Sequence, residues 1–123
     1  MSGPTMKYTV THYRKPDHTH EEFIKWIVDV HLPLAIPIFK RHGVLSYSLM
    51  RKIQPTWDVA DFDCFIEYTI RDMETISKVM SDKEWSTAIK DQEDWVDVKR
   101  ALVSVGYSTP YLLETGEVVN MAK

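Results

Sequence analysis

Four segments of the chain alternate apolar and polar side chains, and helical segments separate them in a fixed order. The first, KYTVTHYR at 7–14, is rich in β-branched and aromatic residues, as strands usually are. VLSYSLMRKI from Val44, DFDCFIEY at 61–68 and the stretch from Ala101 to Gly106 repeat the alternation. The order β, α, β, β, α, β predicts an α+β, ferredoxin-like fold with a four-stranded antiparallel sheet.

The first helical segment begins after PDHTHEE, where Thr19 and Glu22 have the spacing of a capping box. Apolar residues then recur at helical spacing, at Phe23, Ile27, Val30, Leu34 and Ile38. We expect this helix to end near His42 and Gly43. Pro33 cannot donate to the carbonyl of Asp29, so the helix should kink there or restart.

The second helical region is less regular. RDMETISKVM carries Met73, Ile76 and Met80 on one predicted face, and Ser81 with Glu84 suggests a capping box for a short helix through Trp85 and Ile89. DQEDWVDVK follows as a further helical turn. Its acids and tryptophan fit either a half-buried flap or a solvated amphipathic face.

The strand alternation divides the sheet into two faces. The face that we expect under the helices holds Tyr8, Val10, His12, Leu45, Tyr47, Leu49, Phe62, Cys64, Ile66, Tyr68, Val103 and Val105. The other face is mostly polar but includes Tyr13, Phe65 and Leu102, which favours contact with a second copy and hence a homodimer. A loop around Pro55 and Trp57 should join the middle strands, and the tail after Tyr107 is available to pair with another sheet edge.

Composition narrows the function classes. A chain of 123 residues that is 44% hydrophobic is enough for one domain, which we assign to residues 1–123. With a net charge of −3 and no basic run, we expect no nucleic-acid partner. No apolar stretch suits a signal peptide or a membrane span, so we expect a soluble, cytoplasmic protein. The single cysteine, Cys64, fits a small apolar strand residue better than a nucleophile.

The stretch DVHLPLAIP places one ionisable side chain, His31, at the edge of an apolar helix face. A partly buried histidine at a helix break, opposite strand tyrosines, has surroundings that shift a pKa and can leave room for a ligand. The alternative is a core histidine that bonds a neighbouring hydroxyl. His12, on the apolar face of the first strand, is the other candidate for such a pocket.

The remaining motifs point away from cofactor chemistry. His18 and His20 flank a helix start without a second ligand cluster, so a solvated turn is favoured over a metal site. His42 suits a helix C-terminus. The sequence has no phosphate loop, dinucleotide fingerprint or serine elbow, which predicts a site without a cofactor or metal.

Several long strings carry a family resemblance. The HxP of the helix and the ending GYSTPYLLETGEVVN resemble the EthD-like branch of the dimeric α+β barrel proteins, over roughly Lys7 to Asn120. THYRKPDHTHEEFIKWIVDVHLPLAIPIFKRHGVL, PTWDVADFDCFIEYT and KDQEDWVDVKRALVSVGY are similar to small fungal decarboxylases that act on atrochrysone carboxylic acid, an aromatic polyketide. The resemblance implies a homodimer, a ligand between sheet and helices, and a functional His31.

The resemblance predicts a carboxy-lyase. His31 would act as the general acid that protonates the ring carbon bearing the carboxyl group, with Tyr47 and Tyr68 as the other catalytic residues. Substrate would contact Tyr8, His12, Phe23, Trp26 and Trp85, although aromatic residues at helical spacing are more often core. The alternatives are a polyketide cyclase or dehydratase, in which the same histidine abstracts a proton, and a polyketide-binding protein without activity.

Overall fold

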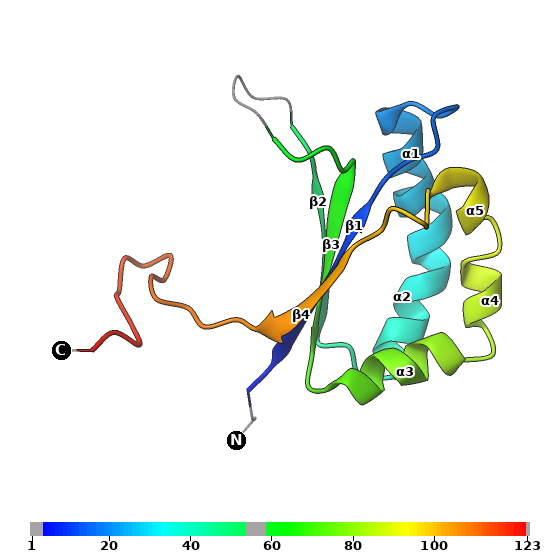
Figure 1. Cartoon of the computed structure of the whole chain (residues 1–123). Helices are drawn as coiled ribbons and strands as arrows, with labels where there is room; N and C mark the ends of the chain where they lie inside the picture. Colours follow the sequence, from blue (N-terminus) through cyan, green and yellow to red (C-terminus); the bar gives the residue numbers. More distant parts are fainter. Residues whose placement is uncertain (1–3, 54–58, 123) are drawn as a thin grey trace.

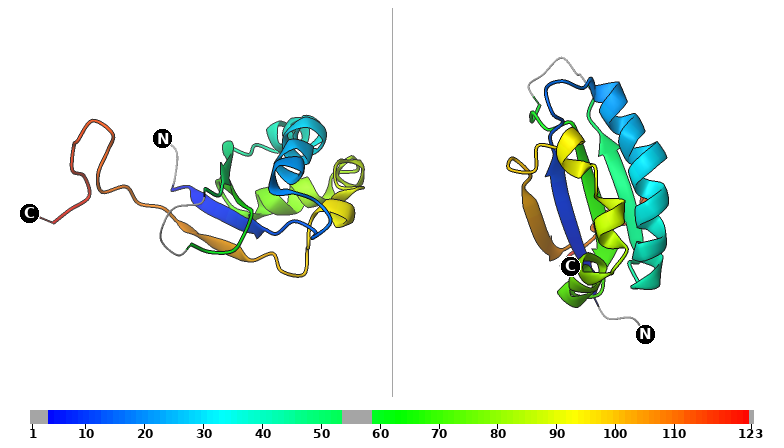
Figure 2. Two further views of the ribbon diagram at one scale, coloured as in Figure 1. Left: turned by 90° about the horizontal axis from the view of Figure 1, so that it is seen from above. Right: turned by 90° about the vertical axis from the view of Figure 1, so that its right-hand side faces the viewer.

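The computed structural model describes residues 4–53 and 59–122, so the loop expected around Pro55 and Trp57 lies outside the described residues. Its centre is a four-stranded antiparallel sheet in the order β2-β3-β1-β4 (Figure 1). The strands are β1 (Met6–His12), β2 (Ser46–Arg51), β3 (Cys64–Ile70) and β4 (Val103–Tyr107). The helices lie on one face (Figure 2), and the predicted ferredoxin-like fold is confirmed.

The register brings the predicted apolar residues to the helical face. Tyr8 on β1 stands opposite Tyr68 on β3, which in turn stands opposite Tyr47 on β2. The next row along the strands is formed in the same way by Val10, Ile66 and Leu49. Residues two apart share a face of a strand, so this register fixes which side chains meet the helices.

One long helix contains a local change of hydrogen bonding. It consists of α1 (His20–Trp26), the π-helical turn η1 (Ile27–His31) and α2 (Leu32–Arg41). The predicted capping box is present, because the Thr19 side chain accepts from Glu22 N and the Glu22 carboxylate accepts from Thr19 N. In η1 the N–H of Leu32 donates to the carbonyl of Ile27, a bond of the π type.

The π turn is the form that the predicted break takes. Pro33 supplies no N–H to the preceding turn and occupies the first turn of α2, where a proline is tolerated. The ribbon runs through the junction without a change of course (Figure 2). The turn therefore alters the angular position of His31 on the helix without interrupting the helix.

The second helical region differs in detail from its prediction. It comprises α3 (Met73–Ser81), α4 (Trp85–Ala88) and α5 (Gln92–Trp95). Helix α3 buries Thr75, Ile76 and Val79, whereas Met73 and Met80 are 40% and 54% exposed. The predicted face is therefore wrong except for Ile76.

The predicted capping box of Ser81 and Glu84 is also wrong, because Ser81 lies inside α3. Asp82 takes its place, and its Oδ1 accepts from Glu84 N at 2.8 Å. Its Oδ2 accepts from Arg41 Nη1 and bonds His42 Nε2, each at 2.7 Å. These bonds to the end of α2 fix where α3 stops.

The far edge of the sheet is uncovered. Val103 and Val105 lie on the helical side by register, yet they are 52% and 45% exposed, and β4 stands at the margin of the helical layer (Figure 2). The chain then leaves the body as an arm, residues 108–122, with a small hairpin closed by the bridge between Leu112 and Val118 (Figure 1). No described helix is long and apolar enough to cross a membrane.

Two residues were assigned to the wrong face of the sheet. Tyr13 is buried, and the Arg100 guanidinium lies 4.0 Å from its ring centre, so Tyr13 is not part of the open face. Phe62, which precedes β3, packs on Phe65 with ring centres 6.1 Å apart. The bend at Asp61 and Asp63 interrupts the strand alternation between Phe62 and Cys64, which explains why Phe62 was assigned to the wrong face.

Candidate functional site

A small chamber lies between the sheet and the helices, and His31 is on its wall. Its volume is about 20 Å³. The lining residues come from β1, α1, η1, β2, α5 and the residue after α5, and they are His12, Trp26, Ile27, His31, Tyr47, Gln92 and Val96. A space of this size holds about one water molecule.

His31 is held in one tautomer by the backbone of α4. Its Nδ1 lies 3.0 Å from the carbonyl oxygen of Ala88. A carbonyl only accepts, so Nδ1 carries the hydrogen and donates, and Nε2 of the neutral ring has the free lone pair. Burial lowers the pKa of His31, and the bond to Ala88 opposes that shift in part. His31 is therefore a neutral ring with a basic Nε2.

His12 stands at the end of β1 on the same chamber. Burial, and then the proximity of His31, lowers its pKa from 6.5 to about 4. Its Nδ1 is buried and has no hydrogen-bond partner among the described residues. Two neutral imidazoles thus face one small space, an arrangement that accepts protons and hydrogen bonds more readily than it donates them.

A stack of four aromatic rings positions His31. His18 lies on Trp95 with ring centres 3.8 Å apart, Trp95 is 5.7 Å from Trp26, and Trp26 is 5.6 Å from His31. The rings are within 20° of parallel at each step. Trp85 meets His31 edge-on at 6.1 Å. The imidazole is therefore restrained on its face, at its edge and at Nδ1.

The predicted tyrosines form a second group beside the chamber. Tyr47 lines it, and Tyr68 meets Tyr47 with ring centres 5.0 Å apart. Tyr8 meets Tyr68 at 5.7 Å, one step farther away. Burial raises the pKa of Tyr47 and of Tyr68 well above the usual tyrosine value. Both hydroxyls therefore stay protonated and able to donate at neutral pH.

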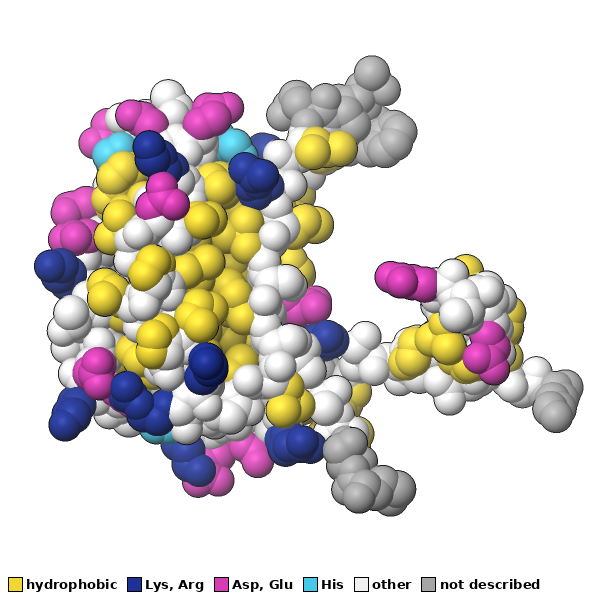
Figure 3. Space-filling model, turned by 180° about the vertical axis from the view of Figure 1, so that it is seen from behind, with side chains coloured by type: hydrophobic (Ala, Val, Ile, Leu, Met, Phe, Trp, Pro, Cys, Tyr) yellow, Lys and Arg dark blue, Asp and Glu magenta, His cyan; other side chains and the backbone are white. Residues whose placement is uncertain are grey.

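An open groove of about 700 Å³ lies next to the chamber, between α1 and β2. Figure 3 shows apolar side chains gathered in the hollow between the helical layer and the sheet. The lining residues are His20, Glu21, Ile24, Lys25, Val28, Asp29, Leu49, Arg51, Lys52 and Ile53. This volume is in the range of small-molecule sites.

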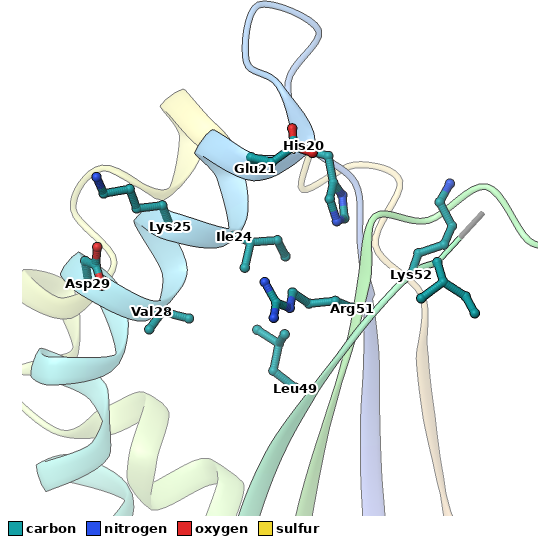
Figure 4. A pocket seen from close by; sticks show the side chains of 10 residues that line it. His20, Glu21, Ile24, Lys25, Val28, Asp29, Leu49, Arg51 and Lys52 are labelled. Atoms are coloured by element: carbon teal, nitrogen blue, oxygen red, sulfur yellow. The ribbon is translucent and has the colours of Figure 1, made fainter.

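The groove has an apolar floor and one inward-pointing cation. The Arg51 guanidinium points into it between Ile24 and Leu49, whereas Lys25 and Asp29 point outward (Figure 4). Apolar side chains lie between groove and chamber. Leu49 follows Tyr47 by two residues on one face of β2 and packs on the core cluster that includes Ile27. An apolar floor beside one guanidinium suits an apolar ligand that carries a negative charge.

The structure brings four of the predicted site residues onto one chamber: His31, Tyr47, His12 and Trp26. Tyr68 and Trp85 lie in contact with that group, and Tyr8 contacts Tyr68 behind it. Phe23 is fully buried in the neighbouring core cluster and lines neither chamber nor groove.

Sequence reasoning missed two parts of the site. Gln92 of α5 lines the chamber, and Arg51 points into the groove. Arg51 had a usable signal, since it continues the alternation of Tyr47 and Leu49 along β2. Gln92 had none, because a single-turn helix has no measurable periodicity.

The weaker candidates have structural roles. His18 stacks on Trp95 and bonds the Asp94 carbonyl at 2.9 Å, and His20 lies 3.2 Å from Asp63 Oδ1. Within the described ranges, no group of three histidine, cysteine or acidic side chains is placed to hold a metal ion. Cys64 is fully buried, and burial raises the pKa of its thiol to about 12, so it is no nucleophile at neutral pH.

Comparison with known proteins identifies a family and finds relatives that are named for two different reactions. Residues 15–99 match the EthD domain. Dehydratase iacD of Pestalotiopsis fici is 30% identical over 96% of this chain and 95% of its own length. Decarboxylase nsrE of Aspergillus novofumigatus is 24% identical over 91% of this chain and 82% of its own length. The names of these relatives divide between loss of water and loss of carbon dioxide.

Two solved structures share the fold. An EthD family protein of Bacillus halodurans has a TM-score of 0.64 at 19% identity, covering 85% of this chain and 99% of that chain. A dimeric protein with a ferredoxin-like fold from Bacteroides fragilis has the same TM-score at 9% identity, covering 88% and 100%. At these identities the likeness concerns the fold alone.

Proposed function

The chain belongs to the EthD domain family, and we propose that it is a lyase for an aromatic polyketide in which neutral His31 removes a proton from carbon. The observation that carries this proposal is the bond from His31 Nδ1–H to the Ala88 carbonyl, which leaves Nε2 as the basic atom. The dehydratase and decarboxylase names among the relatives support the lyase class.

The reaction that suits this arrangement best is dehydration of a β-hydroxy ketone. Nε2 of His31 takes the proton from the carbon between the carbonyl and the hydroxyl-bearing carbon, and the C–H electrons move to the carbonyl oxygen. A protonated tyrosine hydroxyl, that of Tyr47, donates to this oxygen as its charge grows. The electrons then form the C=C bond as the C–O bond breaks, and the new imidazolium protonates the leaving hydroxide to give water.

Decarboxylation, the reaction first expected from the sequence, is the second candidate. The decarboxylase name of one relative and the apolar walls support it, since burial disfavours a carboxylate. It needs an acid to protonate the ring carbon. His31 and His12 are both neutral at neutral pH because burial lowers their pKa values. The chamber therefore favours proton removal over proton delivery.

The fused rings of the substrate would occupy the groove rather than the chamber. The groove of about 700 Å³ accommodates a polycyclic ligand, whereas the chamber of about 20 Å³ admits only a small polar substituent. The apolar side chains between groove and chamber, Leu49 among them, must move for the reacting carbon to approach His31. Arg51 would bind a phenolate or carboxylate at the groove end.

The proposal is tested with two purified substrates, a polycyclic β-hydroxy ketone and the matching phenolic carboxylic acid. We expect a product lighter by the mass of water from the first, formed faster than in buffer and not formed by His31→Gln. Release of carbon dioxide from the second, with no dehydration of the first, would establish the second candidate. Tight binding of both without turnover would make the chain a binding protein.

A homodimer is part of the proposed function. The open face of the sheet carries exposed Met50 and Leu102, and the uncovered strand β4 presents Val103, Val105 and Tyr107. The arm, residues 108–122, presents exposed Tyr111, Leu112, Val118 and Met121. Apolar surface of this extent usually marks an interface. A second copy is the simplest partner, and one solved structure of this fold is described as dimeric.

A further inference from the structure

Two side chains that line the chamber each carry a buried polar atom that has no hydrogen-bond partner among the described residues. One is Trp26 Nε1, whose N–H only donates, and the other is His12 Nδ1. Both side chains line the chamber together with His31. Leaving a buried polar group unbonded is costly, so such groups in native proteins are nearly always satisfied by a bound partner.

The size and chemistry of the chamber define that partner. A volume of about 20 Å³ is sufficient for one water-sized group. A water or hydroxyl oxygen can accept from the Trp26 N–H while its hydrogen is donated to a neutral imidazole of His12 or His31. A chloride ion could use the Trp26 N–H but would leave the imidazole lone pairs unsatisfied. The donor and acceptor set therefore fits a neutral O–H group.

We propose that the chamber is the binding site for the hydroxyl group that the substrate loses, and that Trp26 Nε1–H is the donor to that oxygen. The inference rests on the proposed dehydration for its catalytic part. As the C–O bond breaks, the oxygen gains negative charge and the bond from Trp26 strengthens. The proton from His31 Nε2 then completes a water molecule that stays bound until the product leaves. Between turnovers a solvent water takes the same place.

The first test is a crystal structure of the wild-type protein without substrate, at a resolution that shows ordered water. We expect one water within about 3.2 Å of Trp26 Nε1 and of a ring nitrogen of His12 or His31. In Trp26→Phe, which keeps an aromatic ring in the stack, this water should be lost. Trp95→Phe, a matched change one ring farther along the stack, should keep it. A wild-type chamber without ordered water, or an unaltered water in Trp26→Phe, would overturn the site.

The second test measures turnover of the β-hydroxy ketone by Trp26→Phe and by His42→Gln, a control at the far end of α2 that lines neither the chamber nor the groove. We expect Trp26→Phe to lower kcat about 10- to 100-fold, with a smaller effect on KM, and His42→Gln to leave kcat unchanged. An ordered water together with an unchanged kcat in Trp26→Phe would refute the role in leaving-group departure. A wild-type protein that dehydrates no hydroxy ketone would refute the proposed function instead. The crystallographic result would still decide whether the chamber binds an O–H group.

Discussion

Replacing His31 separates a catalytic role from a structural one, because the structure shows what each substitution removes. His31→Gln loses the basic ring nitrogen but can keep a donor to the Ala88 carbonyl. His31→Ala loses both, together with the ring between Trp26 and Trp85. We expect either variant to lower kcat by about 10² to 10⁴, the usual contribution of a positioned general base.

The effect on stability should differ between the two variants. In His31→Ala the carbonyl of Ala88, a residue that is 4% exposed, loses its donor, which costs about 1 to 3 kcal/mol. For a domain of this length that corresponds to a fall in Tm of about 3 to 10 °C. His31→Gln should lose less than about 1 kcal/mol, because its amide can reform the bond. The two variants should therefore lose similar amounts of kcat, whereas Tm should fall more in His31→Ala than in His31→Gln.

The assay is kcat for the β-hydroxy ketone and Tm by calorimetry on the same preparations. His42→Gln serves as the matched control, since His42 bonds Asp82 at the far end of α2 and lines neither the chamber nor the groove. It should lower Tm and leave kcat unchanged. A folded His31→Gln variant with full activity would refute the catalytic argument, whatever its Tm.

Three further predictions concern pH, the groove and the arm. The pKa of His12 is about 4 in the folded protein and 6.5 in the unfolded chain, so the protein should lose about 3 kcal/mol of stability as pH falls from about 6.5 to about 4. Urea unfolding at several pH values should show this loss, and the loss should be smaller in His12→Phe. Arg51→Gln should raise KM for an anionic substrate about fivefold, as expected for a partly exposed ion pair, whereas Lys25→Gln, which removes an outward-pointing charge, should not; equal KM values in steady-state kinetics would contradict the role of Arg51. Removing residues 108–123 should shift the protein toward monomer in sedimentation velocity, and an unchanged dimer would exclude the arm from the interface.

Local signals in the sequence were sufficient to predict most of the fold. The alternation along β1, β2 and β3 set both their identity and their faces, because the period of a strand is two residues. The capping box at Thr19 and the proline at Pro33 located the start and the irregular turn of the long helix. These features depend on neighbours within about five residues, which is why they could be predicted.

The errors fall where distant residues decide the outcome. Helix α3 turns Val79 inward rather than Met80, and Asp82 rather than Ser81 caps the following turn. Asp82 is bonded by Arg41 and His42, about forty residues earlier in the chain. A pattern of apolar residues cannot reveal such a bond, so the sequence supported a plausible cap one residue too early.

The chemical role of His31 also depends on a contact with a residue that is distant in the sequence. The sequence placed this histidine on the edge of an apolar face opposite tyrosines, and the structure puts it on one chamber with His12 and Tyr47. Whether a histidine delivers or removes a proton depends on its charge and tautomer. Here burial sets the charge, and the Ala88 carbonyl, 57 residues later in the chain, sets the tautomer. Burial favours the neutral ring, and the Ala88 contact leaves Nε2 as its basic atom. These two features together are why we propose a general base in place of the general acid expected from the sequence, and dehydration in place of decarboxylation as the favoured reaction.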